Sequence, residues 1–335
     1  MNEASCDLPH CNVLLTRVSM LFTMMCAASH DRRELNNFSE LRLLAHALGP
    51  QRVGVVAAED QVALTAADAA LQLGIAIPVL IGDERKIRMM LDALELALID
   101  KAEFVDADDA ALVAAHMARD NMVDLLLKGH LRTDQLLRAV LDNKAELRSG
   151  RLLSDVFFYE DRLAGNLRLV GITDGGLNVS PNLEQKKQIV QNAIEVMRSM
   201  GLRRPKIAIM SATEAVSTSV PSTVDAQALT AMGDAGQFGD AEVFGPLALD
   251  CALLGSAAQA KGIAHPVAGR ADCMVVPNIE AGNLLGKSAK YLGGSQCAHV
   301  VAGAKVPILI PSRVESVDDK LNSIALGVIF ATRHF

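Results

Sequence analysis

The stretch RVGVVAAEDQVALTAADAALQLGIAIPVLI, residues 52–81, contains the pattern on which the fold prediction depends. Residues 52–57 are a short apolar run typical of a buried strand, and residues 61–73 have the apolar spacing of a helix that ends at Gly74. Residues 77–81 form a second apolar run. A strand, a helix and a strand in this order predict a βαβ unit with a right-handed crossover and two parallel strands.

The same alternation extends outward from this stretch. Helices are expected at residues 41–48, 85–98, 108–120, 133–141, 224–232, 251–261 and 317–331. Further strands are expected at residues 103–105, 123–127, 156–159, 167–172, 206–210, 244–248, 273–276, 300–302 and 306–310. Another helix is expected to begin with Ser180 as its N-cap and Pro181 as its first residue. This pattern predicts a doubly wound α/β fold with mostly parallel sheets.

The composition agrees with that fold class and restricts the partners. Half of the 335 residues are apolar, but only 3% are aromatic, so aliphatic side chains and Met must fill the core. Such a core is typical of parallel sheets covered by helices. The net charge is −7 and no dense run of Lys and Arg occurs, so no nucleic-acid partner is expected. A locally basic pocket for an anionic substrate is compatible with this charge.

The length of the chain exceeds what one hydrophobic core usually covers, so two α/β domains are expected, with the polar segment 144–150 between them. Residues 1–38 precede the regular pattern as an extension without an assignment. Their apolar part, residues 13–28, is shorter than a membrane span. It ends in small residues as a signal peptide does, but Glu3 and Asp7 do not fit the basic start of one. We therefore expect no membrane association.

The cysteines indicate neither a zinc site nor a disulfide framework. They are Cys6, Cys11, Cys26, Cys251, Cys273 and Cys297. None forms a CxxC pair, so no metal site is expected. A reduced chain in the cytoplasm is the simplest interpretation.

Polar turns follow several predicted strands, where ligands bind in open α/β sheets. These turns are Lys128-Gly129-His130, Thr173-Asp174-Gly175-Gly176, Ser211-Ala212-Thr213-Glu214 and Pro311-Ser312-Arg313. Each alone is compatible with an ordinary turn, but together they favour a site for a polyanion. His130 is the best-placed histidine, either as a turn residue or as a catalytic one. The sequence has no GxxxxGK[ST] or GxGxxG signature, so it does not indicate nucleotide hydrolysis or dinucleotide oxidation. It also has no GxSxG or HExxH signature of common hydrolases.

The stretch VPILIPSRVESVDDK, residues 306–320, is the most informative about chemistry. A buried strand leads to the hydroxyl of Ser312 and the guanidinium of Arg313, and a helix then begins with two carboxylates. A structural interpretation competes with a catalytic one, because Ser316 and Asp319 have the spacing of a capping box. Arg313 is likewise compatible with a surface ion pair. The residues alone leave both interpretations open.

Further stretches occur in a fixed order along the chain. They are KGHxxTxxLLRAV (128–140), ITD (172–174), LEQK (183–186), QNA (191–193), PSTVDA (221–226), GPLALD (245–250), VAGRAD (267–272), EAGN (280–283) and GAKVPI (303–308), which runs into Ser312-Arg313. With them the chain resembles the phosphate acetyl/butyryl transferase family from about residue 50 to residue 332.

The resemblance implies two α/β domains of the isocitrate/isopropylmalate dehydrogenase type, with the active cleft between them. It implies that the C-terminal segment returns to the first domain, so that domain I comprises residues 39–147 and 305–335 and domain II residues 148–304. It also implies reversible transfer of a short acyl group between coenzyme A (CoA) and inorganic phosphate. CoA is then a substrate, with no tightly bound cofactor. The expected ligands are acyl-CoA, phosphate and acyl phosphate, and a homodimer is expected.

By position, Ser312, Arg313 and Asp319 fall on the catalytic serine, arginine and aspartate of this family. The resemblance implies direct attack of the CoA thiolate on acyl phosphate in a ternary complex. Asp319 would then take the thiol proton or position the thiol, Ser312 would donate to the developing oxyanion, and Arg313 would hold the phosphoryl group. Arg138 matches an arginine expected near CoA or phosphate. Further candidates for the same anion pocket are Lys128, Thr133, Arg151 and His130.

Two positions depart from the family pattern. Pro311 stands where relatives commonly have Thr, and Gly286 where they more usually have Tyr, so the loop and the acyl or CoA pocket are expected to differ. Residues 320–326, KLNSIAL, look more like the butyryl branch, but acetyl stays open. One alternative is a non-catalytic module of this fold that senses CoA or acyl phosphate. A dehydrogenase of the related architecture would need metal-binding carboxylates and a nucleotide loop, and neither can be placed.

Overall fold

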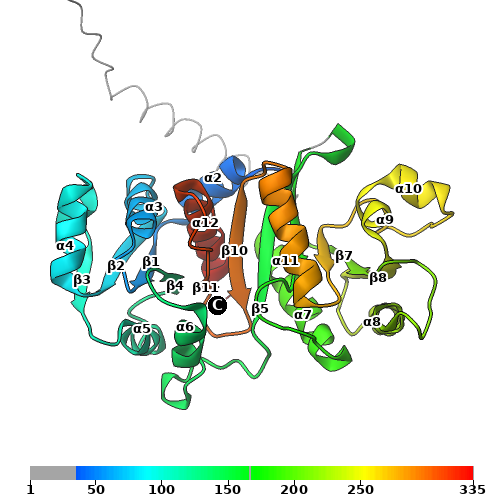
Figure 1. Cartoon of the computed structure of the whole chain (residues 1–335), viewed down its shortest axis with the longest axis horizontal. Helices are drawn as coiled ribbons and strands as arrows, with labels where there is room; N and C mark the ends of the chain where they lie inside the picture. The colour runs from blue at the N-terminus through cyan, green and yellow to red at the C-terminus, as the bar shows by residue number, and fades with distance from the viewer. Residues whose placement is uncertain (1–34, 166, 335) are drawn as a thin grey trace, which may run out of the picture. The chain divides into compact units, whose positions relative to one another are not determined.

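The computed structural model describes residues 35–165 and 167–334 (Figure 1). The apolar part of the expected N-terminal extension, residues 13–28, lies outside them. Within the described residues, eleven strands form one sheet in the order β3-β2-β1-β4-β11-β10-β5-β6-β9-β7-β8. The strands are β1 (Gln51–Val56), β2 (Ala76–Gly82), β3 (Glu103–Asp106), β4 (Leu125–Lys128), β5 (Ser154–Asp161), β6 (Arg168–Thr173), β7 (Lys206–Met210), β8 (Glu242–Leu247), β9 (Cys273–Val275), β10 (Cys297–Ala302) and β11 (Ile308–Leu309).

Helices alternate with most of these strands along the chain. The α-helices are α2 (Phe38–Leu48), α3 (Gln61–Gln72), α4 (Glu84–Ala93), α5 (Ala110–Arg119), α6 (Thr133–Val140), α7 (Leu183–Ser199), α8 (Pro221–Asp234), α9 (Leu249–Leu253), α10 (Gly255–Ala260), α11 (Ile279–Lys287) and α12 (Val317–His334). Short 3₁₀ helices are η1 (Ala97–Asp100), η2 (Asn143–Ala145) and η3 (Leu163–Gly165), and η4 (Ser288–Leu292) is a π-helical turn.

Most neighbouring strands are parallel, and the predicted fold class is confirmed. Strand β1 pairs in parallel with both β2 and β4, and β9 pairs in parallel with both β6 and β7. The centre of the sheet is different, because β5 pairs antiparallel with both β6 and β10, and β10 pairs antiparallel with β11. Figure 1 shows β1, β2 and β3 on one side of β10 and β5, and β7 and β8 on the other.

The first βαβ unit forms where the sequence predicted it. Asp60 is the N-cap of α3, and its side chain accepts a hydrogen bond from the backbone N–H of Ala63 at 2.8 Å. Gly74 has a φ of +66° just after α3, a conformation that glycine adopts without steric cost. The chain then enters β2, whose Val79 lies opposite Gly54 of β1 in the parallel register.

Some helix boundaries predicted from the sequence are wrong. Helix α7 does not begin at Ser180, because Asn182 and Gln185 form a capping box in which each side chain accepts the other's backbone N–H at 2.9 Å. The single helix expected at 251–261 is two helices, since Leu254 between α9 and α10 is extended. The helix expected at 85–98 ends at Ala93, before the 3₁₀ turn η1.

The buried side chains divide between the two faces of the sheet, because successive residues of a strand point to opposite faces. Leu125 and Leu127 of β4 and Phe158 of β5 belong to one cluster, which α2, α3, α7 and α12 cover. On the other face, Leu126 belongs to a cluster with α5 and α6, and Phe157 to a separate cluster beneath α9 and α11. One face of the sheet therefore carries a single continuous hydrophobic core, whereas the other face carries two separate cores.

The C-terminal segment returns to strands formed much earlier in the chain. Ile308 of β11 pairs in parallel with Leu126 of β4 and antiparallel with Val301 of β10. Helix α12 follows, and Ile324 and Phe330 are almost fully buried. Each such side chain stabilises the fold by about 1.5–3 kcal/mol.

None of the helices among the described residues has both the length and the apolar character that a membrane span requires.

Candidate active site

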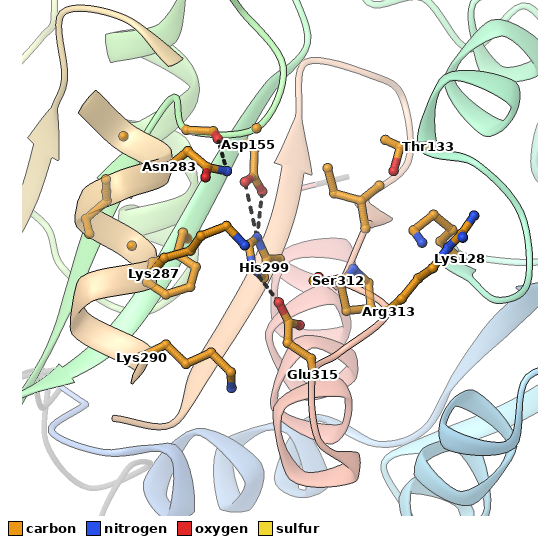
Figure 2. A pocket seen from close by; sticks show the side chains of 18 of the residues that line it. Lys128, Thr133, Asp155, Asn283, Lys287, Lys290, His299, Ser312, Arg313 and Glu315 are labelled. Carbon is orange, nitrogen blue, oxygen red and sulfur yellow. Dashed lines mark hydrogen bonds and ion pairs between the residues drawn. The ribbon is translucent and has the colours of Figure 1, made fainter. Parts of the chain in front are cut away.

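A cavity of about 460 Å³ lies between the two cores of the divided face. Its walls include Ile310 from one core and Phe157 and Ile172 from the other. Lys128, at the end of β4, and Ser312, after β11, also line it, as expected at the carboxyl ends of parallel strands. Figure 2 shows Lys287 and Lys290 on one side of His299, and Ser312, Arg313 and Lys128 on the other.

The loop between β11 and α12 presents Ser312 and Arg313 to the cavity. The backbone N–H of Glu315 donates to the carbonyl of Ser312 at 3.2 Å and closes a turn. Among the described residues, no side chain forms a hydrogen bond or ion pair with the Ser312 hydroxyl or the Arg313 guanidinium. Both groups are therefore available to a ligand.

Two lysines add positive charge to the cavity. Lys128 is only 4% exposed, and Lys287 of α11 is exposed on the opposite wall (Figure 2). Neither has a carboxylate partner among residues 35–165 and 167–334. Burial, together with the charges of Lys320 and Arg313, lowers the pKa of Lys128. A bound anion would relieve this repulsion.

A histidine between two carboxylates lies at the centre of the cavity wall. His299 Nδ1 is 3.1 Å from Asp155 Oδ2, and its Nε2 is 3.2 Å from Glu315 Oε1 (Figure 2). Burial opposes the cationic form, but the two carboxylates raise the pKa of His299 well above its ordinary value. Burial raises the pKa of Glu315 and His299 lowers it, with a net decrease. The three side chains form a buried imidazolium–carboxylate triad.

Asp319 lies behind the cavity and is not part of its wall. Its carboxylate accepts hydrogen bonds from the Lys290 ammonium, from the Cys297 N–H at 2.9 Å, and from the N–H and hydroxyl of Ser316 at 3.0 and 2.6 Å. Ser316 Oγ in turn accepts from the Asp319 N–H at 3.2 Å, so the capping box is present. Burial raises the pKa of Asp319, but these donors, Lys290 foremost, lower it overall. Lys290 itself does line the cavity.

The structure brings together four of the eight predicted site residues. Lys128, Thr133, Ser312 and Arg313 line the same cavity. Outside its wall, Arg138 is exposed and pairs with Asp134 at 2.9 Å, and Arg151 pairs with Glu195 at 2.6 Å. His130 is also exposed and outside the wall. Functional roles for Arg138, Arg151 and His130 stay predictions.

Sequence reasoning missed several residues that line the cavity. They are Asp155, Asn283, Lys287, Lys290, His299 and Glu315. The signal for His299 was an ionisable residue within the otherwise apolar strand β10, where burial demands a partner. Asp155 gave no such signal, because β5 also contains Ser154, Glu160 and Asp161. His130 was a candidate because of its place in a motif, but position in a motif does not show which side chains lie together in the fold.

The turn after β6 was predicted as a polar strand end, and it lies at the cavity. Asp174 organises it by accepting from the N–H groups of Gly176 at 2.8 Å and Leu177 at 2.9 Å. Burial, followed by the charge of Asp155, raises the pKa of Asp174 to about 6. A Cβ at Gly175 would lie 2.7 Å from the backbone of Gly282, so this glycine permits α11 to approach the turn.

Comparison with known proteins agrees with this geometry. The family model described as "Phosphate acetyl/butaryl transferase" matches residues 99–328. A phosphate acetyltransferase of Rhizobium meliloti is 38% identical over 301 residues, which cover 89% of this chain and 94% of that protein. A phosphate butyryltransferase of Clostridium beijerinckii is 35% identical, with coverage of 89% and 99%.

A solved structure is also similar. The branched-chain phosphotransacylase from Enterococcus faecalis V583 superposes with a TM-score of 0.75 at 29% identity, over 85% of this chain and 100% of that one. The family predicted from the motifs is therefore confirmed, and this protein is an acyltransferase. The chain belongs to the phosphate acetyl/butyryl transferase family.

Proposed function

We propose that this protein transfers a short acyl group reversibly between coenzyme A and inorganic phosphate. One observation carries the proposal: Lys128, Lys287 and Arg313 line one cavity, and none has a carboxylate partner among the described residues. This excess of positive charge suits the phosphate groups that CoA, phosphate and acyl phosphate all carry. The relatives' names, phosphate acetyltransferase and phosphate butyryltransferase, describe the same reaction type.

The phosphoryl group is proposed to bind between β4 and the β11–α12 loop. Arg313 presents a planar guanidinium that can hold two phosphoryl oxygens at once, and the nearby Lys128 adds charge on the same side of the cavity. The Ser312 hydroxyl has no partner among the described residues and would donate to the oxyanion that develops on the acyl carbonyl. Thr133, at the start of α6, supplies a further hydroxyl.

Asp319 is proposed to act as a positioning residue. Its carboxylate has four donors and contacts no free volume of the cavity, which argues against proton transfer with the thiol. Through Lys290 it fixes an ammonium at the cavity wall, and through Ser316 it caps the helix that follows the catalytic loop. From the sequence, Asp319 was expected to take the thiol proton or to position the thiol; the group positioned in this proposal is instead the Lys290 ammonium.

The acyl chain is proposed to lie against the apolar wall. Phe157 and Ile172 are opposite each other in adjacent strands and both line the cavity. Gly286 of α11 faces the Phe157 ring, since a Cβ built there would lie 3.5 Å from it. The missing side chain leaves room beside the ring, which supports acceptance of butyryl as well as acetyl.

Three broader features also belong to the proposal. The chain is expected to act as a homodimer in the cytoplasm, with CoA as a substrate and no resident cofactor. The proposed domains are residues 39–147 with 305–335 and residues 148–304; the change of strand run between β10 and β11 supports this division. Light scattering on the purified protein tests the dimer.

The deciding experiment is thiol release from acetyl-CoA and from butyryl-CoA, each with and without phosphate. Release that depends on phosphate supports the transferase, and the ratio of the two rates gives the acyl preference. A folded protein that binds CoA without releasing thiol from either substrate would contradict the proposal and favour the CoA-sensing module.

A further inference from the structure

His299 of β10 is bonded to three other parts of the fold. Its Nδ1 is 3.1 Å from Asp155 Oδ2 of β5, and its Nε2 is 3.2 Å from Glu315 Oε1 in the β11–α12 loop. Its backbone N–H donates to the Ser323 hydroxyl of α12 at 2.9 Å. The Phe157 ring meets the imidazole edge to face, with 4.9 Å between the ring centroids. The imidazole is therefore held from several sides where it lines the cavity.

The segment that carries Ser312 and Arg313 has few other anchors. Within the described part of the chain, the contact of Glu315 with His299 is the one side-chain hydrogen bond or ion pair that links residues 312–315 to another element. The backbone N–H of Glu315 donates to the Ser312 carbonyl at 3.2 Å, which closes the turn between the two residues. The place of the Ser312 hydroxyl therefore depends on the group that holds Glu315.

The two carboxylates determine the protonation state of the imidazole between them. An ionised carboxylate is only an acceptor, so Asp155 and Glu315 each need an N–H from His299. A neutral imidazole has one N–H and can serve one of them, whereas the imidazolium has two. Burial lowers the pKa of His299, but the two carboxylates outweigh it and raise the pKa well above its ordinary value. The link from β5 to the loop is therefore complete only while the ring is a cation.

We propose that His299, as an imidazolium, is a positioning residue for acyl transfer: through Glu315 it fixes the turn that presents the Ser312 hydroxyl to the substrate. This inference rests on the proposed function. The guanidinium of Arg313 belongs to the same turn and is held by the same contact. Both N–H groups of His299 are engaged by carboxylates, so the ring acts through Glu315 and exchanges no proton with the substrate. Asp155 does not contact the loop and acts through His299.

Ionisable groups from many elements surround this triad and enter any pH profile of the enzyme. Asp155 and Glu315 are the two in contact with the ring. The others are Lys128 of β4, Arg132 and Asp134 near the start of α6, Asp174 after β6, Lys287 of α11, Lys290 of η4, Cys297 of β10, Arg313 of the loop and Asp319 of α12. A ratio of variant to wild-type kcat at each pH cancels the titrations that both proteins share.

The first test is a double-mutant cycle on kcat with His299→Gln and Ser312→Ala, measured with acyl phosphate and CoA. Gln has one amide nitrogen and no charge, so it cannot join both carboxylates. His299→Gln is expected to lower kcat by about 10–100-fold, because the Ser312 hydroxyl is present but misplaced. When Ser312 is already Ala, that hydroxyl cannot be misplaced. The combined loss in the double variant is therefore expected to be about tenfold smaller than the product of the two single losses.

Asp155→Asn gives the second readout, the pH profile of kcat. Asn still accepts from Nδ1 but carries no charge, so one carboxylate instead of two stabilises the cation and the pKa of His299 is lower than in the wild type. The ring then loses its proton, and the turn its anchor, at lower pH. The fall of kcat at high pH is expected to begin about one pH unit or more below that of the wild type. The ratio of Asp155→Asn to wild-type kcat therefore decreases as pH rises.

A merely structural role for the triad predicts the opposite pH trend. Asp155→Asn loses the stabilisation by the cation, which is present at low pH, so activity lost through unfolding alone would be greatest near pH 6 and recover as pH rises. In the double-mutant cycle, unfolding would reduce the amount of active enzyme equally in both backgrounds, and the losses would multiply. Circular dichroism at each pH reports whether each variant is folded.

His46→Gln is the matched control, because His46 is exposed, lies outside the cavity wall and has Nδ1 2.8 Å from the Leu73 carbonyl oxygen. Its kcat should stay near the wild-type value at every pH. Losses that multiply in the cycle, or an Asp155→Asn ratio that is constant or rises with pH, would overturn the proposal. If His299→Gln does not fold, the cycle is run with Asp155→Asn at a pH where its ratio has fallen, and the same coupling is expected. A wild-type protein without phosphate-dependent thiol release overturns the proposed function itself.

Discussion

His299 Nδ1 lies 3.1 Å from Asp155 Oδ2, and this buried contact joins strand β10 to strand β5 beside the cavity. The other ring nitrogen of His299 contacts Glu315 in the loop that carries Ser312 and Arg313. A continuous path of charged contacts therefore runs from the centre of the sheet to the β11–α12 loop. Because these groups are desolvated, the loss of one partner leaves the others without compensation.

Asp155→Asn is expected to destabilise the fold by about 3 kcal/mol near pH 6, since breaking a buried ion pair typically costs this much. The raised pKa of His299 means that its contribution is fully present below the unfolded pKa of about 6.5 and is lost as pH rises through the folded value. Asp155→Asn lacks much of that contribution, so its free energy of unfolding is further below the wild-type value at pH 6 than at pH 9. Urea unfolding of both proteins at the two pH values measures the difference.

Asp240→Asn is the matched control, because Asp240 is 62% exposed and pairs with Arg198 on the surface. Its effect should stay within about 1 kcal/mol at both pH values. An Asp155→Asn deficit that grows with pH would show that His299 is not held as a cation.

Ser312→Ala and Arg313→Gln are each expected to lower kcat by about 10²–10³-fold, because each removes a donor directed at charge that develops in the transition state. The fold should be unaffected, since neither side chain has a partner among the described residues. Arg204→Gln is the control: this exposed arginine pairs with Glu242, and Arg204 is not part of the cavity wall. Near wild-type kcat in both site variants would exclude this assignment.

Most helices and strands could be predicted from the sequence, because their apolar spacing and their caps depend on residues that are neighbours along the chain. The apolar runs of β1 and β2 and the cap at Asp60 were recognisable from the sequence. The start of α7 was misplaced because Ser180 and Pro181 also have the features of a helix start. Only the hydrogen bonds of Asn182 with Gln185 show which start forms.

The site was only partly predictable, because its members come from distant segments. Ser312 and Arg313 were found through a contiguous motif, and both line the cavity. His299 and Asp155 are 144 residues apart, and their contact requires the antiparallel pairing of β10 with β5. No local spacing encodes that pairing.

Lys128→Met is expected to raise the KM for phosphate by tenfold or more while leaving the free energy of unfolding unchanged or slightly increased. The ammonium is buried near Lys320 and Arg313 without a carboxylate partner among the described residues, so its charge opposes folding. Removing it relieves that cost and deletes a phosphate contact. Steady-state kinetics at varied phosphate and urea unfolding give the two quantities. A variant with lower stability and an unchanged KM would indicate a purely structural lysine.

Gly286→Ala is expected to lower the rate ratio of butyryl to acetyl by about tenfold, the effect of one methylene in an apolar pocket. A Cβ at this position makes an ordinary 3.5 Å contact with the Phe157 ring, so it fills space beside the ring without a clash. The variant should also be more stable by about 0.5–1 kcal/mol, because alanine favours a helix interior over glycine.

Gly255→Ala in α10 is the matched control for this substitution. A Cβ there has no neighbour within 4 Å, and Gly255 is not part of the cavity wall, so the acyl ratio should not change. Rates with acetyl-CoA and butyryl-CoA are compared for both variants at saturating phosphate. If Gly286→Ala gains stability but keeps the wild-type acyl ratio, the proposal that the acyl chain lies against Phe157 is wrong.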